Sequence, residues 1–192
     1  MALFELVDQT KVRFKEPASS LWDFPGYARA YWEAASQLAE SQPDNSLAAF
    51  PMAFLYRHAL ELAIKSILVG EGPITGKCED DVLKIGHRLT PHTGDLRKVL
   101  EHHSLLDAFG YQFRALETLI KEWETLDPDA MALRYSVKKD GNTASNERLE
   151  KVRIDAVGLS RDMDGALNYL FDCLSEIHRR MHRDILEEEG VE

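Results

Sequence analysis

A chain of 192 residues is long enough for one domain with a sizeable core and too short for two ordinary ones. Hydrophobic residues make up 44% and charged residues 29%, proportions that exclude disorder as the main state. The net charge of −10 lacks the basic footprint of proteins that grip nucleic acid by its phosphates, so contact with RNA or DNA requires a local basic pocket or a partner.

The two cysteines, Cys78 and Cys173, stand far apart and in different surroundings. Neither forms a CxxC motif or a Cys/His pair at zinc spacing, so we expect no structural metal, no disulfide scaffold and no cofactor. The first residues lack the basic and then apolar pattern of a signal peptide, and no apolar run approaches the roughly 20 residues that span a bilayer. These features predict a cytoplasmic protein without membrane contact.

The first part of the chain predicts two helices behind an N-terminal arm over residues 1–23. Between residues 24 and 38, apolar side chains recur at i, i+3 and i+4, which is typical of one face of a helix. Residues 41–45 form a polar loop with a proline. A second helix is predicted from about 47 to 69, because two glycines follow closely as stop signals.

The middle of the chain begins with a long polar connection, residues 70–90, which is rich in glycine. A connection of this length inside a compact domain is often functional. Thr90-Pro91 suits a helix start with proline at the first helical position, and a third helix is predicted from there to about His103. A fourth helix is predicted over 104–126, ended by an Asp-Pro-Asp sequence.

The last part of the chain changes character at residues 132–154, where two strand-like runs around an Asp-Gly-Asn turn predict a small β-hairpin. Asp155 suits the cap of a last long helix, whose apolar residues between 159 and 185 repeat at near-heptad spacing. Residues 187–192 are predicted to be a solvated acidic tail. The fold predicted for residues 24–186 is all-α, an up-and-down bundle of four to five helices with the hairpin inserted before the last one.

The second helix is apolar nearly all round, which marks a helix in the middle of a bundle. Its polar exceptions fall within roughly 100° of arc: Arg57, His58, Glu61 and Lys65. The spacing i, i+4, i+8 lets Glu61 pair with Arg57 or Lys65. Two interpretations follow, a solvated helix face or a polar seam that faces a cleft or a dimer interface. Burying charges is costly unless they are paired, which favours a seam with a purpose.

A second pattern lies on the third helix, where Arg97 is followed five residues later by His102. This spacing brings both side chains within reach of one phosphodiester. The arginine would stabilise developing negative charge, and the histidine would act as general acid or base. His103 gives a second register. The alternative is an ordinary solvated face, because an arginine and a histidine occur at this spacing by chance.

Other candidate residues lie in the connections. His87 follows Gly86 at a helix entrance, where it either caps backbone groups or binds a ligand. Arg134 and Tyr135 open the predicted hairpin, as an ordinary strand pair or as a cation at one end of the bundle. The sequence has no P-loop, dinucleotide fingerprint, Ser-His-Asp signal or HExxH motif.

The chain resembles bacterial proteins of the HEPN superfamily in three segments: Leu55–Leu62 with Lys65, Gly86–Leu89, and Leu133–Tyr135. The resemblance covers roughly residues 24–186 and implies a four- or five-helix up-and-down bundle. It also implies a function, since many HEPN proteins are metal-independent ribonucleases of toxin–antitoxin, phage-defence and RNA-processing systems. Their hallmark is an Arg-x4–6-His motif that both protomers of a dimer contribute to one composite site.

The hallmark maps onto Arg97 and His102, with His103 as the alternative histidine. The residue after the arginine is Lys98, where the family favours Asn, Asp or His. Other HEPN domains are non-catalytic and bind nucleotides or partner proteins, and the negative charge of this chain fits that class better.

The resemblance therefore predicts a metal-independent ribonuclease of a toxin or phage-defence type, acting on RNA as a homodimer, with an antitoxin or defence-system protein as partner. His102 would be the acid or base and Arg97 the phosphate clamp. The supporting residues would be Arg57, His58, Glu61, Lys65, His87, Arg134 and Tyr135. One alternative is a non-catalytic HEPN-like module that binds a nucleotide or protein through the polar seam, and another is a purely structural dimerisation domain.

Overall fold

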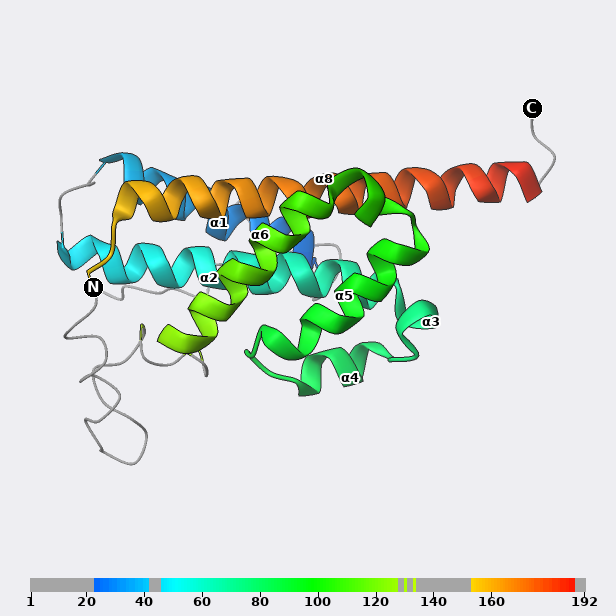
Figure 1. Ribbon diagram of the computed structural model, residues 1–192, viewed down its shortest axis with the longest axis horizontal. Helices are drawn as coiled ribbons and strands as arrows, with labels where there is room; N and C mark the ends of the chain where they lie inside the picture. The colour runs from blue at the N-terminus through cyan, green and yellow to red at the C-terminus, as the bar shows by residue number, and fades with distance from the viewer. Residues whose placement is uncertain (1–22, 42–45, 128–129, 131–132, 134–152, 189–192) are drawn as a thin grey trace, which may run out of the picture.

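The computed structural model describes residues 23–41, 46–127, 130, 133 and 153–188, and every regular element among them is a helix (Figure 1). These helices are α1 (Phe24–Ser41), α2 (Ser46–Gly70), α3 (Gly72–Thr75), α4 (Glu79–Lys84), α5 (Thr90–His102), α6 (Leu105–Leu126) and α8 (Ala156–Glu188). The all-α class predicted from the sequence is confirmed for this part of the chain.

Five of the helices, α1, α2, α5, α6 and α8, begin and end within a few residues of the predicted ones. The connection over 70–90 differs from the expected open loop, because it contains the short helices α3 and α4. Gly76 and Gly86 lie close behind their ends at φ 69° and 72°, a left-handed conformation that favours glycine. Helices this short leave no periodic pattern that a sequence reader can recognise.

Three expectations fall wholly or mostly outside the described residues: the N-terminal arm, the body of the β-hairpin and the end of the acidic tail. At the described edges of the expected hairpin, Leu133 lies in a turn and residues 153–155 have no regular structure. Helix α8 continues through Glu188, so the first two residues of the expected tail are helical.

The helices α1, α2 and α8 lie side by side as the long layer of the molecule (Figure 1). Helix α1 runs opposite to α2, whereas α8 runs in the same direction as α2. Between them in the chain, α5 and α6 pack as a pair, and α6 crosses the layer obliquely. This excursion returns the chain to the end where α2 began, and α8 then runs parallel to α2 (Figure 1).

Helix α2 is the central element, in contact with α1, α3, α4, α5 and α8. Its side chains at Tyr56, Leu60 and Ile64 are fully buried, as expected for a helix that is apolar nearly all round. The apolar stripe of α8 is also used within the chain, because it is buried from Met163 to Ile177. A dimer therefore needs a surface other than this part of the stripe.

Candidate functional site

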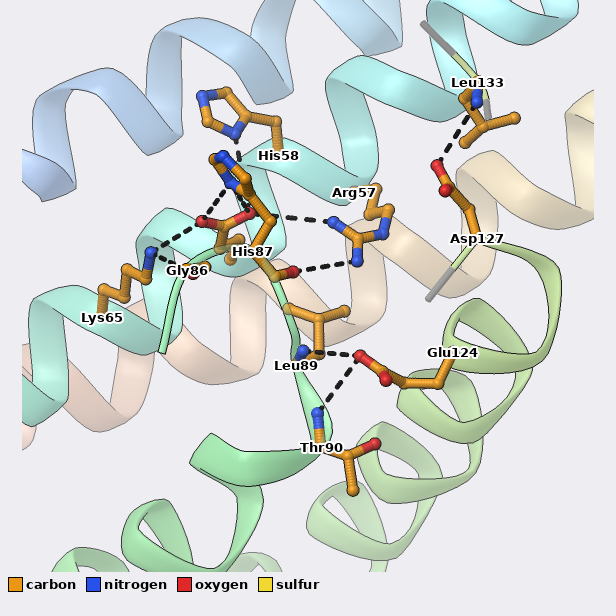
Figure 2. Close-up of polar contacts among 11 residues, drawn as sticks. Arg57, His58, Lys65, Gly86, His87, Leu89, Thr90, Glu124, Asp127 and Leu133 are labelled. Atoms are coloured by element: carbon orange, nitrogen blue, oxygen red, sulfur yellow. Dashed lines mark hydrogen bonds and ion pairs between the residues drawn. The ribbon is translucent and has the colours of Figure 1, made fainter. Parts of the chain in front are cut away.

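The centre of the candidate site is a group of charged residues on α2. Arg57, Glu61 and Lys65 follow one another at successive turns and are only 1%, 1% and 5% exposed. With His58 on the same helix and His87 between α4 and α5, they form what we call the Glu61 cluster (Figure 2). Their burial makes the solvated-face interpretation wrong for the three charged residues.

The Glu61 carboxylate is the hub of the cluster. Lys65 Nζ donates to Oε1 at 2.7 Å, and His87 Nδ1 lies 3.1 and 3.2 Å from the two oxygens. Arg57 Nη1 lies 3.7 Å and His58 Nδ1 3.9 Å from Oε2. Burial alone would raise the pKa of Glu61, but the neighbouring His58 and Lys65 outweigh it and lower the pKa to about 2. The carboxylate is thus ionised at neutral pH.

The two cations of the cluster also bind the backbone that enters α5. Arg57 Nη2 donates to the carbonyl of His87 at 2.9 Å, and Lys65 Nζ donates to the carbonyl of Gly86 at 2.7 Å. Gly86 adopts the left-handed conformation at this point, which directs its carbonyl without a side-chain clash. The cluster therefore joins α2 to a segment about 20 to 30 positions further along the chain.

Helix α6 holds the same segment from its other side (Figure 2). Glu124 Oε1 accepts hydrogen bonds from the backbone N–H groups of Leu89 at 2.6 Å and Thr90 at 3.4 Å. The first amides of a helix have no partner within it, and the side chain before α5 is a leucine, which offers no cap. Glu124 takes this role from a distant part of the sequence.

The two histidines form the accessible edge of the cluster. The side chains of His58 and His87 are 22% and 48% exposed, while that of Glu61 is 2% exposed. His58 packs edge-on against Tyr31 and is stacked on Phe54, with ring centroids at 4.5 and 5.7 Å. Because ionised Glu61 can only accept, neutral His87 donates through Nδ1, and its Nε2 is the basic nitrogen.

The predicted pair on α5 has a different environment. Arg97 Nη2 bonds Glu117 Oε1 of α6 at 2.6 Å, and its guanidinium lies 4.7 Å from the centre of the Phe113 ring. His102 is exposed at the last turn, with its ring edge-on to His103 at 5.0 Å. Five positions on a helix correspond to about 140° of rotation, so the two side chains leave α5 in different directions.

The alternative histidine, His103, is mostly buried. Its Nε2 lies 3.1 Å from Glu71 Oε2, and its side chain is 11% exposed. Its backbone carbonyl accepts a hydrogen bond from Arg180 of α8. His103 therefore ties the turn between α5 and α6 to the end of α2 and to α8.

The remaining candidates, Arg134 and Tyr135, lie outside the described residues. In the described part of the chain, no group of three or more His, Cys, Asp or Glu side chains is arranged to hold a metal ion.

A polar hub that sequence reasoning missed lies on the other side of α2. The carboxylate of Asp164 on α8 accepts hydrogen bonds from four side chains at 2.5 to 3.3 Å: Trp32, Ser36, Tyr56 and Ser160. It joins α1, α2 and α8, and it gives a structural role to Tyr56. The available signal was a carboxylate inside the apolar pattern of the last helix.

A second missed residue is His92 at the start of α5. It is fully buried, and neither ring nitrogen has a hydrogen-bond partner in the described part of the structure. Burial and the nearby charge of Lys65 lower its pKa to about 4, so the ring is neutral at neutral pH. Nothing in the local sequence distinguishes it from the exposed His102.

Comparisons with known proteins add no relative: no family model, curated protein or solved structure matches the chain. None of the helices in the described ranges combines the length and apolarity needed to cross a membrane.

Proposed function

We propose that this chain is a HEPN-like helical domain that cleaves RNA without a metal ion, and that the Glu61 cluster is its working site. The supporting observation is one buried, ionised carboxylate beside two imidazoles that reach the surface. Histidine exchanges protons near neutral pH, and an adjacent carboxylate orients the ring and stabilises its charged form.

In the proposed reaction, Nε2 of His87 takes the proton from a ribose 2′-hydroxyl, and the resulting oxygen attacks the adjacent phosphorus. Protonated His58 donates to the departing 5′-oxygen as that P–O bond breaks. The products are a 2′,3′-cyclic phosphate and a 5′-hydroxyl. Arg57 and Lys65 outnumber Glu61 in charge, so the cluster is net positive before either ring is protonated and favours a phosphate.

The pair Arg97 and His102 is a second location for the same chemistry. In a composite site between two copies, Arg97 of one protomer would face His102 of the other, and the direction of each side chain within one protomer would matter less. Arg97 would exchange its partner Glu117 for a phosphate. Because this location requires both a dimer and that exchange, we prefer the Glu61 cluster as the site of the reaction.

The biological setting that we propose follows from the HEPN resemblance. The protein would be a cytoplasmic toxin or phage-defence ribonuclease that works as a dimer, with an antitoxin or defence-system protein as partner. The proposed domain spans residues 24–186, with the five long helices as its bundle.

A non-catalytic binding module is the second candidate, and one observation favours it. The cations near each location already have partners: Arg57 and Lys65 bond backbone carbonyls, and Arg97 bonds Glu117. A nucleotide or a protein partner would then bind at the accessible edge formed by His58 and His87, with no reaction.

The test is cleavage of total RNA in the presence of a chelator, with single-stranded DNA as a second substrate. We expect the wild type to cut RNA, leave DNA intact and produce 2′,3′-cyclic phosphate ends. His87→Ala and His58→Ala should each lower the rate by about 10²–10⁴-fold, as removal of a proton-transfer group commonly does. His178→Ala, at an exposed position of α8, is the matched control and should cut like the wild type.

The same assay separates the alternatives when Arg97→Ala and His102→Ala are included. Loss of cleavage in these two variants alone would move the reaction to the α5 pair. A pure wild-type protein that cuts no RNA would contradict the nuclease proposal and favour the binding module. Circular dichroism of each variant checks that lost activity is not lost folding.

A further inference from the structure

Aromatic rings gather at the accessible edge of the Glu61 cluster. The ring of His58 extends from α2 towards α1, where Tyr31 meets it edge-on with 4.5 Å between the ring centroids (Figure 2). Phe54, one turn earlier on α2, lies parallel to the same imidazole within 9° and at 5.7 Å. All three side chains are half-buried, so each leaves part of its surface open to solvent. The edge that carries the exchangeable protons therefore also carries planar apolar surface.

Tyr27 continues this aromatic surface along α1. It lies one turn before Tyr31, and side chains four positions apart leave a helix on the same side. Because α1 runs opposite to α2, the turn before Tyr31 lies beside the turn of α2 that follows His58 (Figure 1). Trp32 leaves the other side of α1, where it bonds a carboxylate of α8. We call Tyr27 and Tyr31 the tyrosine pair; it borders the cluster on the side away from α8.

Packing does not explain the exposure of Tyr27. The rings of Phe24, Tyr31 and Trp32 on the same helix pack against the core, whereas Tyr27 is 48% exposed. Its neighbourhood distinguishes it from an isolated surface tyrosine, because the adjoining cluster presents two histidines to solvent. Aromatic surface beside a few polar groups is typical of a ligand site.

The charges next to the tyrosine pair indicate a nucleotide as the ligand. Arg57 and Lys65 outnumber Glu61 in charge. Arg88 is exposed directly after His87. A phosphate suits this positive charge, and a nucleobase presents a flat face that stacks on an aromatic ring. Bases within a duplex stack on one another, so only an unpaired base reaches a side chain in this way.

We propose that the tyrosine pair is a stacking platform for an unpaired nucleobase, which places the adjoining phosphodiester at His58 and His87. The substrate class is then single-stranded RNA. This inference rests on the proposed function, because it takes RNA as the ligand. Tyr27 and Tyr31 are positioning residues that exchange no proton. Stacking requires no basic surface, so it gives affinity to a chain whose net charge is −10.

The test measures binding of the full chain to a short, labelled 2′-O-methyl RNA by fluorescence anisotropy. The methylated 2′-oxygen cannot attack the phosphorus, so the probe is bound without being cut. We expect the wild type to bind the single-stranded probe about tenfold or more tighter than the same strand annealed to its complement. Equal affinity for the two probes, or binding to neither, would overturn the proposal.

Tyr27→Leu is the main variant, because an exposed side chain can be replaced without disturbing the core. It should weaken binding of the single-stranded probe about 5–100-fold, as the loss of one stacked base commonly does. Tyr27→Phe keeps the ring and should bind like the wild type. Tyr111→Leu, at a 77% exposed tyrosine of α6, is the matched control and should also bind like the wild type. Wild-type affinity in Tyr27→Leu would contradict the proposal.

Cleavage of a single-stranded RNA separates this proposal from the nuclease proposal. The KM of Tyr27→Leu should rise by a factor similar to its loss of binding, because stacking holds the substrate. A wild type that binds the probe through Tyr27 but cuts no RNA supports the platform and contradicts the nuclease proposal alone. A wild type that cuts RNA, with Tyr27→Leu equal to it in KM and in binding, overturns the platform alone.

Discussion

Two helices of this molecule, α2 and α5, carry basic and acidic residues at regular spacing and use them in different ways. On α2, Arg57, Glu61 and Lys65 are buried and bonded to one another and to the backbone of residues 86–87. On α5, Arg97 is partly exposed and bonds a single residue of α6, and His102 lies at the surface.

The difference comes from the rest of each helix. Helix α2 is apolar on nearly every side, so any charged residue on it becomes buried with the helix and requires partners. Helix α5 has a buried stripe that includes Leu96, Val99 and Leu100. One carboxylate, Asp95, is buried beside it and bonds Lys77 and Lys98, whereas the other charged residues of α5 are partly or fully exposed. A polar residue on a uniformly apolar helix is therefore a stronger signal of a built cluster than a motif on an amphipathic one.

The largest expected effect tests the α2 side of this comparison. Glu61→Ala removes the hub and leaves Arg57 and Lys65 buried beside each other, so we expect a loss of about 3–5 kcal/mol in the free energy of unfolding. Chemical denaturation measures it. Glu101→Ala, at an exposed position of α5, is the control and should change stability little. An unchanged midpoint for Glu61→Ala would show that the cluster does not hold the fold together.

The next expected effect is a pH dependence of stability caused by His92, a buried histidine on α5. It tests whether burial, rather than the helix that carries the residue, decides how a polar side chain affects stability. Its pKa is lowered from 6.5 to about 4 in the folded protein, by burial first and then by Lys65. The unfolded chain therefore binds a proton at a higher pH than the folded one. Stability should be complete above pH 6.5 and should fall by about 3 kcal/mol as the pH decreases towards 4.

The charges that face His92 are Lys65 and Glu61 from α2, Lys77, and Asp95 from α5 itself. The pKa of Glu61 is lowered from 4.5 to about 2 in the folded protein, so its contribution to the free energy of unfolding is lost only below pH 4.5. Comparing the wild type with His92→Leu between pH 6.5 and 4.5 therefore isolates the histidine. The wild type should lose more stability over this interval, and parallel curves for the two proteins would contradict the assignment.

Local patterns in the sequence were enough to predict the five long helices and the pairing of Glu61 with Lys65. Apolar periodicity and i, i+4 spacing are properties of neighbouring residues, so a reader of the sequence can find them. The partners Gly86, His87 and Glu124 act from other parts of the chain, and no local rule connects them to α2 or α5. The resemblance grouped His87 with Glu61, but only the structure shows the contact.

The apolar stripe of α8 is a second example of what a local sequence pattern does not predict. Its near-heptad repeat predicted the helix. The same repeat occurs in a helix that packs within its own bundle and in one that packs against a partner, so it does not distinguish the two. The structure shows that residues from Met163 to Ile177 pack within the chain. Which surface of a bundle remains uncovered depends on how all the helices are arranged, and that arrangement was not predictable from the periodicity of α8.

The smallest expected effect tests the α5 side of the comparison. Arg97→Ala removes one partly exposed ion pair with Glu117 and the contact of its guanidinium with the Phe113 ring, so a loss of about 1 kcal/mol is expected. His102→Ala should leave the free energy of unfolding unchanged, because its ring is exposed at the end of α5. Denaturation of both variants at low protein concentration, where association is minimal, measures this directly. A loss for His102→Ala that approaches the Glu61→Ala value would mean that the exposed end of α5 is as firmly built as the buried cluster, and the distinction between the two helices would fail.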